Sequence, residues 1–416
     1  MKISHPDFSR RIVPILSTQL VGLACGIAGV RLSSQLVAPA DYGFYGVFVS
    51  FTPLGMAVVY AGLVKFLSRH WVDEPRRPEL LRAVLAGVAR KAPWLVAAVA
   101  GVTFFFAPAP RLTFGLLLLA SALLLAFMQL AQSALQTARE HWRDFVVSGG
   151  SSLLRSFLPP LLYAATGAGL PALLAGFTLQ ALGGAALGAG QMRRWWARRT
   201  GAPAAGPATL PPVYDGPLFV LLAVAGWTLA GLNRWLVLAF HGPETAGYFT
   251  LAANIGAILP TMLGTVLIQY YQPGWFALEA ATPEARRFLL RHVDRAALVY
   301  TGAAVALVTM LQLVMPWLIG PLVSARYAAA AGLVLATGCS TASLTLGIFY
   351  HAMLLAARRE SACGPADISG AVCLIAGGAL SAAAGIEWFK LWLVFSPVVP
   401  WLVNRTVARR LLLAPG

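Results

Sequence analysis

The most constraining feature of the chain is a series of long apolar stretches that recurs from one end to the other. A helix crosses a bilayer core about 30 Å thick with roughly 20 apolar residues, and twelve such stretches can be recognised in the 416 residues. The sequence therefore predicts an all-α integral membrane protein with twelve transmembrane helices. The predicted spans are 12–37, 42–64, 86–107, 112–135, 146–165, 171–192, 218–240, 245–270, 296–319, 327–356, 366–384 and 389–407.

The basic residues are divided unequally between the two sides that these spans define. Of the 31 Lys and Arg residues, 25 lie in the termini, in every second gap or near the span ends beside those gaps, while Arg111, Arg326 and Lys390 lie in the other gaps or at a span end beside one. Because positively charged loops stay on the cytoplasmic side, both termini are predicted to be cytoplasmic. The net charge of +16 then reflects membrane topology, and we do not expect nucleic acid as a partner.

The polar chemistry of an enzyme is missing from the sequence. No HExxH, GxSxG, Walker or dinucleotide-binding motif occurs, and the outer gaps are too short for a catalytic domain. The four cysteines lie in or at the edge of predicted spans without metal-type spacing. We therefore expect no catalytic residue, no metal site and no cofactor. The first apolar run is too long for a cleaved signal peptide, so it is predicted to stay in the mature protein.

A basic, then Pro-, Ala- and Gly-rich segment divides the chain near its centre. Residues 193–214 are predicted to form a cytoplasmic linker between an N-terminal lobe, residues 1–192, and a C-terminal lobe, residues 215–416. Each lobe holds six predicted spans and begins and ends on the same side. Such lobes are parallel repeats, related by an axis along the membrane normal.

Two pairs of matched sites support the repeat. Pro39 with Gly43 matches Pro243 with Gly247, in the outer turn between the first and second spans of each half. Pro78–Glu79 matches Pro283–Glu284, just before the third span of each half, where proline and a carboxylate suit the first turn of a helix. Thr282 is a candidate cap for the later copy.

Both Pro–Glu pairs open basic segments in which arginines alternate with apolar residues. Two interpretations stay open for these segments. They lie along the cytoplasmic interface as amphipathic helices, or they serve only as topology determinants.

Three segments carry a resemblance to a known family. LVAPADYGFYGVF (36–48), its echo LAFHGPETAGYF (238–249) and WLIGPLVSARYAAAAGLVL (317–335) resemble polysaccharide exporters of the multidrug, oligosaccharidyl-lipid and polysaccharide (MOP) flippase superfamily. These include the Wzx-type O-antigen flippases. The resemblance covers nearly the whole chain in span number, loop length and linker position. The chain lacks room for two further spans, which argues against the fourteen-span lipid II flippase.

The resemblance implies a fold and a function. The two lobes would form a V-shaped central cavity that opens to each side in turn. The substrate would be an undecaprenyl-pyrophosphate-linked oligosaccharide, such as an O-antigen or exopolysaccharide repeat unit, moved from the inner to the outer leaflet of the bacterial inner membrane. Its partners would then include membrane lipid and a polysaccharide polymerase machinery.

Three arginines inside predicted spans are the candidate binding residues. Arg31 lies eight residues before Pro39 and Arg234 nine before Pro243, which puts both roughly 12 to 14 Å below the outer turn. Arg155 lies near the middle of the fifth span. An arginine at this depth costs roughly 2.5 to 3.5 kcal/mol and needs a partner or a polar cavity. Guanidinium groups suit a pyrophosphate, although each could instead snorkel or bond to backbone carbonyls.

Six glutamine and asparagine residues inside the predicted spans are further candidate binding residues. Polar side chains within the spans either meet sugar hydroxyls or form hydrogen bonds between helices: Gln19, Gln35, Gln129, Gln132, Asn233 and Asn254.

Other functions left open are a multidrug exporter of the same superfamily, a membrane polymerase or ligase of lipid-linked sugars, and a scaffold with a degenerate cavity. The coupling ion, H+ or Na+, is not specified by the sequence.

Overall fold

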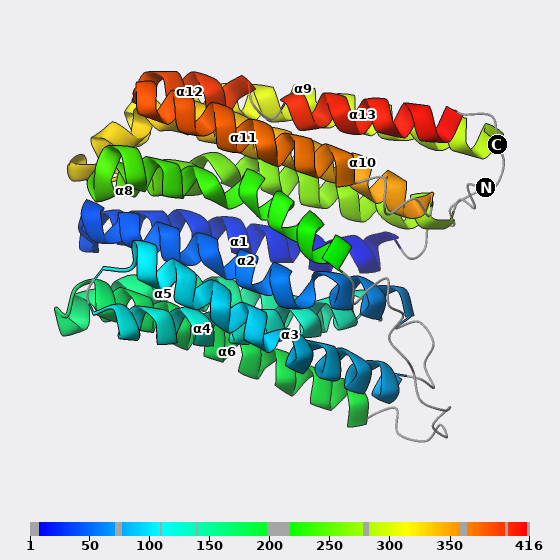
Figure 1. The fold of residues 1–416 in the computed structure, drawn as a ribbon, viewed down its shortest axis with the longest axis horizontal. Helices are drawn as coiled ribbons and strands as arrows, with labels where there is room; N and C mark the ends of the chain where they lie inside the picture. The colour runs from blue at the N-terminus through cyan, green and yellow to red at the C-terminus, as the bar shows by residue number, and fades with distance from the viewer. Residues whose placement is uncertain are drawn as a thin grey trace. The chain divides into compact units, whose positions relative to one another are not determined.

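The computed structural model is almost entirely helical (Figure 1). It describes residues 8–70, 77–108, 110–138, 140–197, 217–277, 283–357, 364–395 and 398–413. The helices are α1 (Phe8–Leu36), α2 (Pro39–His70), α3 (Arg77–Phe106), α4 (Arg111–Thr137), α5 (His141–Thr166), α6 (Leu170–Ala197), α8 (Pro217–Ala277), α9 (Pro283–Leu318), η3 (Ala325–Leu333), α10 (Val334–Ala356), α11 (Gly364–Ala384), α12 (Ile386–Phe395) and α13 (Val398–Leu413).

The helices have the length and surface of a multi-pass membrane protein. Each of the twelve predicted stretches overlaps a helix. In the described part of the chain, seven helices are long and apolar enough to cross a membrane. Large apolar side chains are also exposed on the outside, among them Phe105 and Leu112, each 75% exposed, and Leu380, 74% exposed. In water such a surface would be costly, whereas a bilayer solvates it.

Helices α8 and α5 are two of the helices that differ from the simplest expectation of one apolar helix for each predicted span. Helix α8 holds two predicted spans, which are joined at Gly242 (φ 80°, ψ 173°). This left-handed φ is readily adopted by glycine alone, and Pro243 then opens the second half of α8 with the φ that a first helical turn requires. Helix α5 is not among the seven apolar helices, because serines and Arg155 lower its mean hydropathy.

The predicted interfacial helices after the Pro–Glu pairs are not separate elements. Pro78–Glu79 lies in the first turn of α3, and Glu284 lies in the first turn of α9. Both helices continue without a break into the next predicted span, so the idea of helices that lie along the interface is wrong in this respect. An α9 of 36 residues is about 54 Å long, which exceeds the bilayer core and carries its arginines beyond it. The proposed cap Thr282 lies outside the described residues.

The chain divides into two compact units. Unit 1 comprises residues 1–37 and 48–224, and unit 2 comprises residues 38–47 and 225–416. The first turns of α2 therefore belong to unit 2, although the rest of α2 belongs to unit 1. Most of the predicted linker, residues 198–214, lies outside the described residues, and the predicted lobe boundaries stay a prediction.

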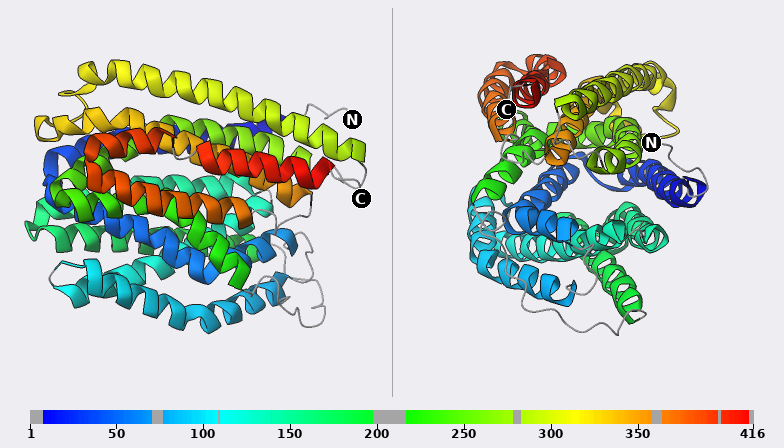
Figure 2. Two further views of the ribbon diagram at one scale, coloured as in Figure 1. Left: turned by 45° about the horizontal axis from the view of Figure 1, so that its top comes forward. Right: turned by 90° about the vertical axis from the view of Figure 1, so that its right-hand side faces the viewer.

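In unit 1, α5 packs closely against α1 and α6, and α6 also packs against α4 (Figure 2). Two contacts fix the direction of α1 relative to α5. A Cβ built on Gly29 would lie 3.0 Å from Cβ of Ser156, and one built on Gly149 would lie 3.7 Å from Val21. Since both contacts advance along the two helices together, α1 and α5 run parallel, as two odd-numbered membrane spans must.

In unit 2, α9, α10 and α13 surround an aromatic core. Tyr300, Phe349 and Tyr350 are almost completely buried in it, together with Trp275 from the end of α8. Helix α11 packs against both α12 and α13, which follow one another in the chain (Figure 1).

The matched Pro and Gly residues of the sequence repeat contact each other within unit 2. A Cβ on Gly43 would lie 2.0 Å from the carbonyl oxygen of Pro243, and a Cβ on Gly247 would lie 1.9 Å from that of Pro39. The contact is reciprocal, and it requires glycine on both sides because any side chain would overlap the opposing backbone. The two turns that the sequence match identified as equivalent therefore also contact each other in the structure. The match alone did not predict this contact.

Candidate functional site

Helix α5 carries a polar face along its length. Asp144, Ser148, Ser152 and Ser156 follow at intervals of four residues, and Arg155 lies within the same face. At 100° per residue, residues spaced in this way stay on one side of a helix. The hydroxyl of Ser148 donates to the Asp144 carboxylate at 3.3 Å, and Ser152 donates to the Ser148 carbonyl at 2.8 Å. This face is the longest polar feature in the predicted spans of unit 1 that the structure describes.

Two of the three predicted arginines lie at nearly the same height on neighbouring helices of unit 1. Because Gly29 of α1 lies against Ser156 of α5, Arg31 and Arg155 lie about one helical turn, roughly 5 Å, apart along the two parallel axes. Both side chains are exposed. Arg155 forms no ion pair with any residue that the structure describes. The sequence could not predict this neighbourhood, because it depends on which helix packs against α1.

The third arginine, Arg234, belongs to unit 2. It lies in the first half of α8 and is half-buried. The adjacent Asn233 is buried with 6% of its surface exposed, and its Oδ1 atom has no hydrogen-bond partner in the described part of the chain. An unsatisfied buried carbonyl is costly, so this position has unused capacity to accept a hydrogen bond.

A partly buried network lies at the start of α5. Gln132 of α4 donates to the hydroxyl of Ser148 at 2.9 Å, and Gln136 donates to the Asp144 carboxylate at 3.0 Å. Asp144 lies two residues before the predicted fifth span. Burial raises the pKa of its carboxyl group, and the hydrogen bonds from Gln136 and Ser148 partly offset that rise. The network joins the first turns of α5 to the end of α4.

The other predicted polar residues are distributed over both units. Gln19 is half-buried on α1, Gln35 is exposed near the end of α1, and Gln129 is exposed on α4. Asn254 lies in unit 2, where its side-chain amide donates to the hydroxyl of Tyr42 at 3.0 Å. Gln132 and Asn254 therefore form the interhelical hydrogen bonds that were one of the two expectations. Contact of any of these residues with a sugar stays a prediction.

Sequence reasoning missed one buried polar residue next to the face of α5. Gln180 of α6 is 1% exposed and donates to the hydroxyl of Ser151 at 3.2 Å, while its Oε1 atom is buried without a partner among the described residues. Gln180 is the only glutamine in the sixth predicted span apart from Gln191, which lies one residue from its end. That isolation was a signal that could have identified it.

Metal ligands do not gather in the described residues, where no group of three or more His, Cys, Asp or Glu side chains could hold an ion. The cysteines found there, Cys25, Cys339 and Cys373, are free.

Comparison with solved structures identifies the fold. The chain is similar to an inward-facing conformation of a multidrug resistance MATE family transporter of the MOP superfamily, with a TM-score of 0.66 and 14% identity over 96% of this chain and 98% of that one. It is also similar to an outward-facing conformation of such a transporter, with a TM-score of 0.63 and 14% identity over 97% and 94% of the two chains. A third example is a MATE structure in complex with MaL6, with a TM-score of 0.62 and 14% identity over 97% and 95%.

At this identity the similarity establishes the fold alone. No protein-family model matches the sequence, and no curated protein matches it. The chain is thus a multi-pass α-helical membrane protein with the fold of MATE transporters of the MOP superfamily.

Proposed function

We propose that the chain is a flippase that moves an undecaprenyl-pyrophosphate-linked oligosaccharide from the inner to the outer leaflet of a bacterial inner membrane. In this proposal, twelve spans form two six-helix lobes with both termini in the cytoplasm, and a central cavity opens to each side in turn. The MATE transporter fold supports transport by alternating access. The substrate class rests on the residues described next.

The observation that carries the proposal is the pair of exposed arginines, Arg31 and Arg155, on parallel neighbouring helices of unit 1. We expect each of the two guanidinium groups to bind one phosphate of a pyrophosphate, through paired donors that do not lose their protons. In the repeat, Arg234 is the counterpart of Arg31. An anionic head group is the ligand that such a set of cations favours.

The polar face of α5 supports an oligosaccharide as the other part of the substrate. A sugar hydroxyl that crosses hydrocarbon without a partner costs several kcal/mol. Ser148, Ser152 and Ser156 provide hydroxyl groups along about 12 Å of helix below and beside Arg155. A polymerase that extends the glycan on the outer side would be the natural partner, and either H+ or Na+ would serve as the coupling ion.

A multidrug exporter is the second candidate, and the similarity to structures of multidrug resistance MATE family transporters favours it. Cationic drugs are held best by carboxylates within the spans. Of the predicted spans, only 366–384 contains an acid, Asp367, which is one residue from its end. The two candidates therefore predict opposite preferences for charge in the transported molecule.

The test is transport by the purified protein in liposomes. A fluorescent undecaprenyl-pyrophosphate oligosaccharide is incorporated, and its movement between leaflets is followed with a quencher that does not cross the membrane. We expect R155Q to lower the flipping rate about a hundredfold, because one phosphate loses its bidentate partner and the loss of a charged hydrogen-bonded pair costs roughly 2 to 3 kcal/mol.

The control variant is R193Q, which removes one exposed charge at the end of α6 and should leave flipping unchanged. Liposomes with the same protein and a fluorescent cationic drug separate the two candidates. Transport of the drug that persists in R155Q, together with no flipping of the lipid-linked sugar by the unaltered protein, would exclude the flippase and favour the exporter.

A further inference from the structure

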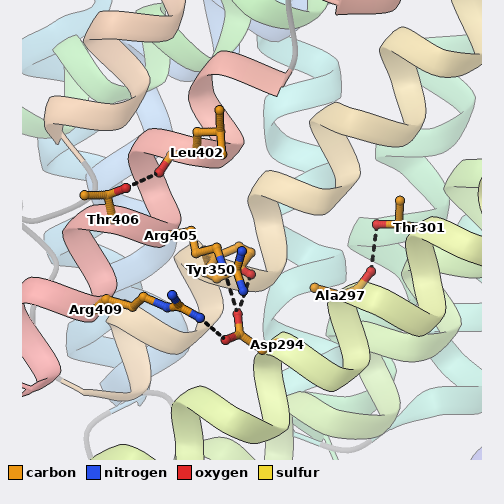
Figure 3. A network of polar contacts seen from close by, with 8 residues as sticks. All are labelled: Asp294, Ala297, Thr301, Tyr350, Leu402, Arg405, Thr406 and Arg409. Carbon is orange, nitrogen blue, oxygen red and sulfur yellow. Dashed lines mark hydrogen bonds and ion pairs between the residues drawn. The ribbon is translucent and has the colours of Figure 1, made fainter.

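A second group of arginines lies in unit 2, away from the residues used above. Asp294 of α9 is surrounded by Tyr350 of α10 and by Arg405 and Arg409 of α13 (Figure 3). The Tyr350 hydroxyl donates to Oδ1 of Asp294 at 2.8 Å. The Nε atom of Arg405 lies 3.4 Å from the same oxygen, and an NH2 nitrogen of Arg409 lies 3.4 Å from Oδ2.

One carboxylate cannot satisfy two guanidinium groups. Each guanidinium carries five N–H donors, and the contacts with Asp294 use one nitrogen of each. The side chain of Arg405 is 34% exposed and that of Arg409 is 50% exposed. The cluster formed by Asp294, Tyr350, Arg405 and Arg409 therefore keeps a net positive charge and unused donors at the surface.

The two guanidinium groups are also held in place. The guanidinium carbon of Arg405 lies 5.5 Å from the centre of the Trp401 ring, in the geometry of a cation–π contact. Tyr350, which fixes the position of Asp294, is 1% exposed in the core of unit 2. A bound anion would therefore meet donors that are already oriented, which lowers the entropic cost of binding.

Exposed apolar side chains continue from this cluster on both helices. On α9, Leu298 follows Asp294 by one turn and is 73% exposed; on α13, Leu402 precedes Arg405 by one turn and is 48% exposed. Beyond the cluster in the opposite direction, Arg291 on α9 and Arg410 on α13 are exposed. Positive charge thus gives way to apolar surface along both helices, in the order of a phospholipid from head group to acyl chain.

From this arrangement we infer a binding site for an anionic phospholipid on the α9–α13 face of unit 2. The phosphate of the lipid would accept hydrogen bonds from Arg405 and Arg409, and its acyl chains would lie along Leu298 and Leu402. Basic pockets at the ends of membrane helices bind anionic head groups in this manner, with about 1 kcal/mol for each arginine near the surface. The site involves none of the arginines proposed to bind the transported pyrophosphate.

The test measures lipid binding to the full-length protein in a neutral detergent by native mass spectrometry. Phosphatidylglycerol and phosphatidylcholine with identical acyl chains are compared. We expect the unaltered protein to prefer phosphatidylglycerol, and we expect R405Q/R409Q to bind it roughly thirtyfold more weakly, which corresponds to two arginine contacts. Binding of phosphatidylcholine should not change. R193Q/R194Q removes two exposed charges from the end of α6 and should keep the preference.

Several outcomes would overturn the inference. One is equal binding of the two lipids; another is equal loss of the preference in R193Q/R194Q, which would indicate a nonspecific effect of charge. Displacement of phosphatidylglycerol by an excess of inorganic phosphate would show that a soluble anion is the ligand. If the double variant does not fold, R409Q alone is used, because its half-exposed side chain contributes less to the core; a preference unchanged in R409Q would also contradict the site. Loss of flipping in R155Q has no bearing on these results.

Discussion

The arginines of α5 and of α13 are the same residue type in two different settings. Arg155 lies on a polar face near the middle of α5 and forms no ion pair with a described residue. Arg405 and Arg409 share the carboxylate of Asp294 and lie in the middle and in the last third of α13. Under the proposed function, the comparison indicates that a guanidinium near the middle of a predicted span is retained without a carboxylate because the transported anion uses its charge, whereas one that shares a carboxylate can be part of the scaffold.

The largest of the effects predicted here is expected when Arg155 receives a carboxylate partner on its own helix, as Arg405 and Arg409 have in Asp294. In S152E the new acid lies three residues before Arg155 on the same helix face, at the distance where opposite charges interact. The flipping rate should fall about fiftyfold, because the carboxylate competes with the pyrophosphate for the guanidinium. The liposome assay measures this rate.

The matched control for that prediction is S152Q, which has nearly the same size without the charge. S152Q removes the Ser152 hydroxyl but adds no charge beside Arg155, so it should lower flipping much less than S152E does. Equal rates for S152E and S152Q would mean that the charge of Arg155 plays no part in transport.

A smaller effect is expected when the charge of Arg155 is kept and its shape is changed. R155K should lower the flipping rate about tenfold, because a lysine offers a point charge in place of two parallel donors. A titration of substrate should show the loss mainly as weaker binding. A rate equal to that of R155Q would instead mean that charge alone contributes nothing at this position.

The smallest effect is expected when Asp294, the carboxylate partner of Arg405 and Arg409, loses its charge. D294N should reduce the free energy of unfolding of unit 2 by about 1 kcal/mol, because the asparagine still accepts from Tyr350 while the partly exposed ion pairs are lost. Thermal unfolding in detergent, followed through tryptophan fluorescence, measures the change. Flipping should be retained, and a loss as large as that of R155Q would contradict the separate roles of the two groups.

Several features of the molecule could be predicted from individual residues. The apolar stretches predicted the helices, and Pro39, Gly43, Pro243 and Gly247 predicted equivalent positions in two repeats. Other features could not be predicted. The basic segment after Pro283 is amphipathic in either case, so the sequence does not distinguish a helix along the interface from one that continues into the next span, as α9 does.

Some features of the candidate site could likewise be predicted from the sequence, and others could not. The sequence indicated Arg31, Arg155 and Arg234, because a charge within an apolar stretch is conspicuous against its neighbours. The sequence offered no means of placing Arg31 and Arg155 on neighbouring helices. It also could not predict the hydrogen bond between Asn254 and Tyr42, which lie 212 positions apart in the chain. Gln180 was overlooked because its partner, Ser151, belongs to another helix.

The sequence by itself determined the helical class and the sparse set of charges inside the predicted spans, because the cost of placing a polar group in hydrocarbon depends on the residue and its depth. Only the tertiary structure decided that α1 runs beside α5 and that Asp294 meets Arg405 and Arg409. In a bilayer, the inner and outer faces of a helix are similarly apolar, so hydropathy does not specify how each helix is rotated. Small residues, close packing and a few hydrogen bonds between helices decide it.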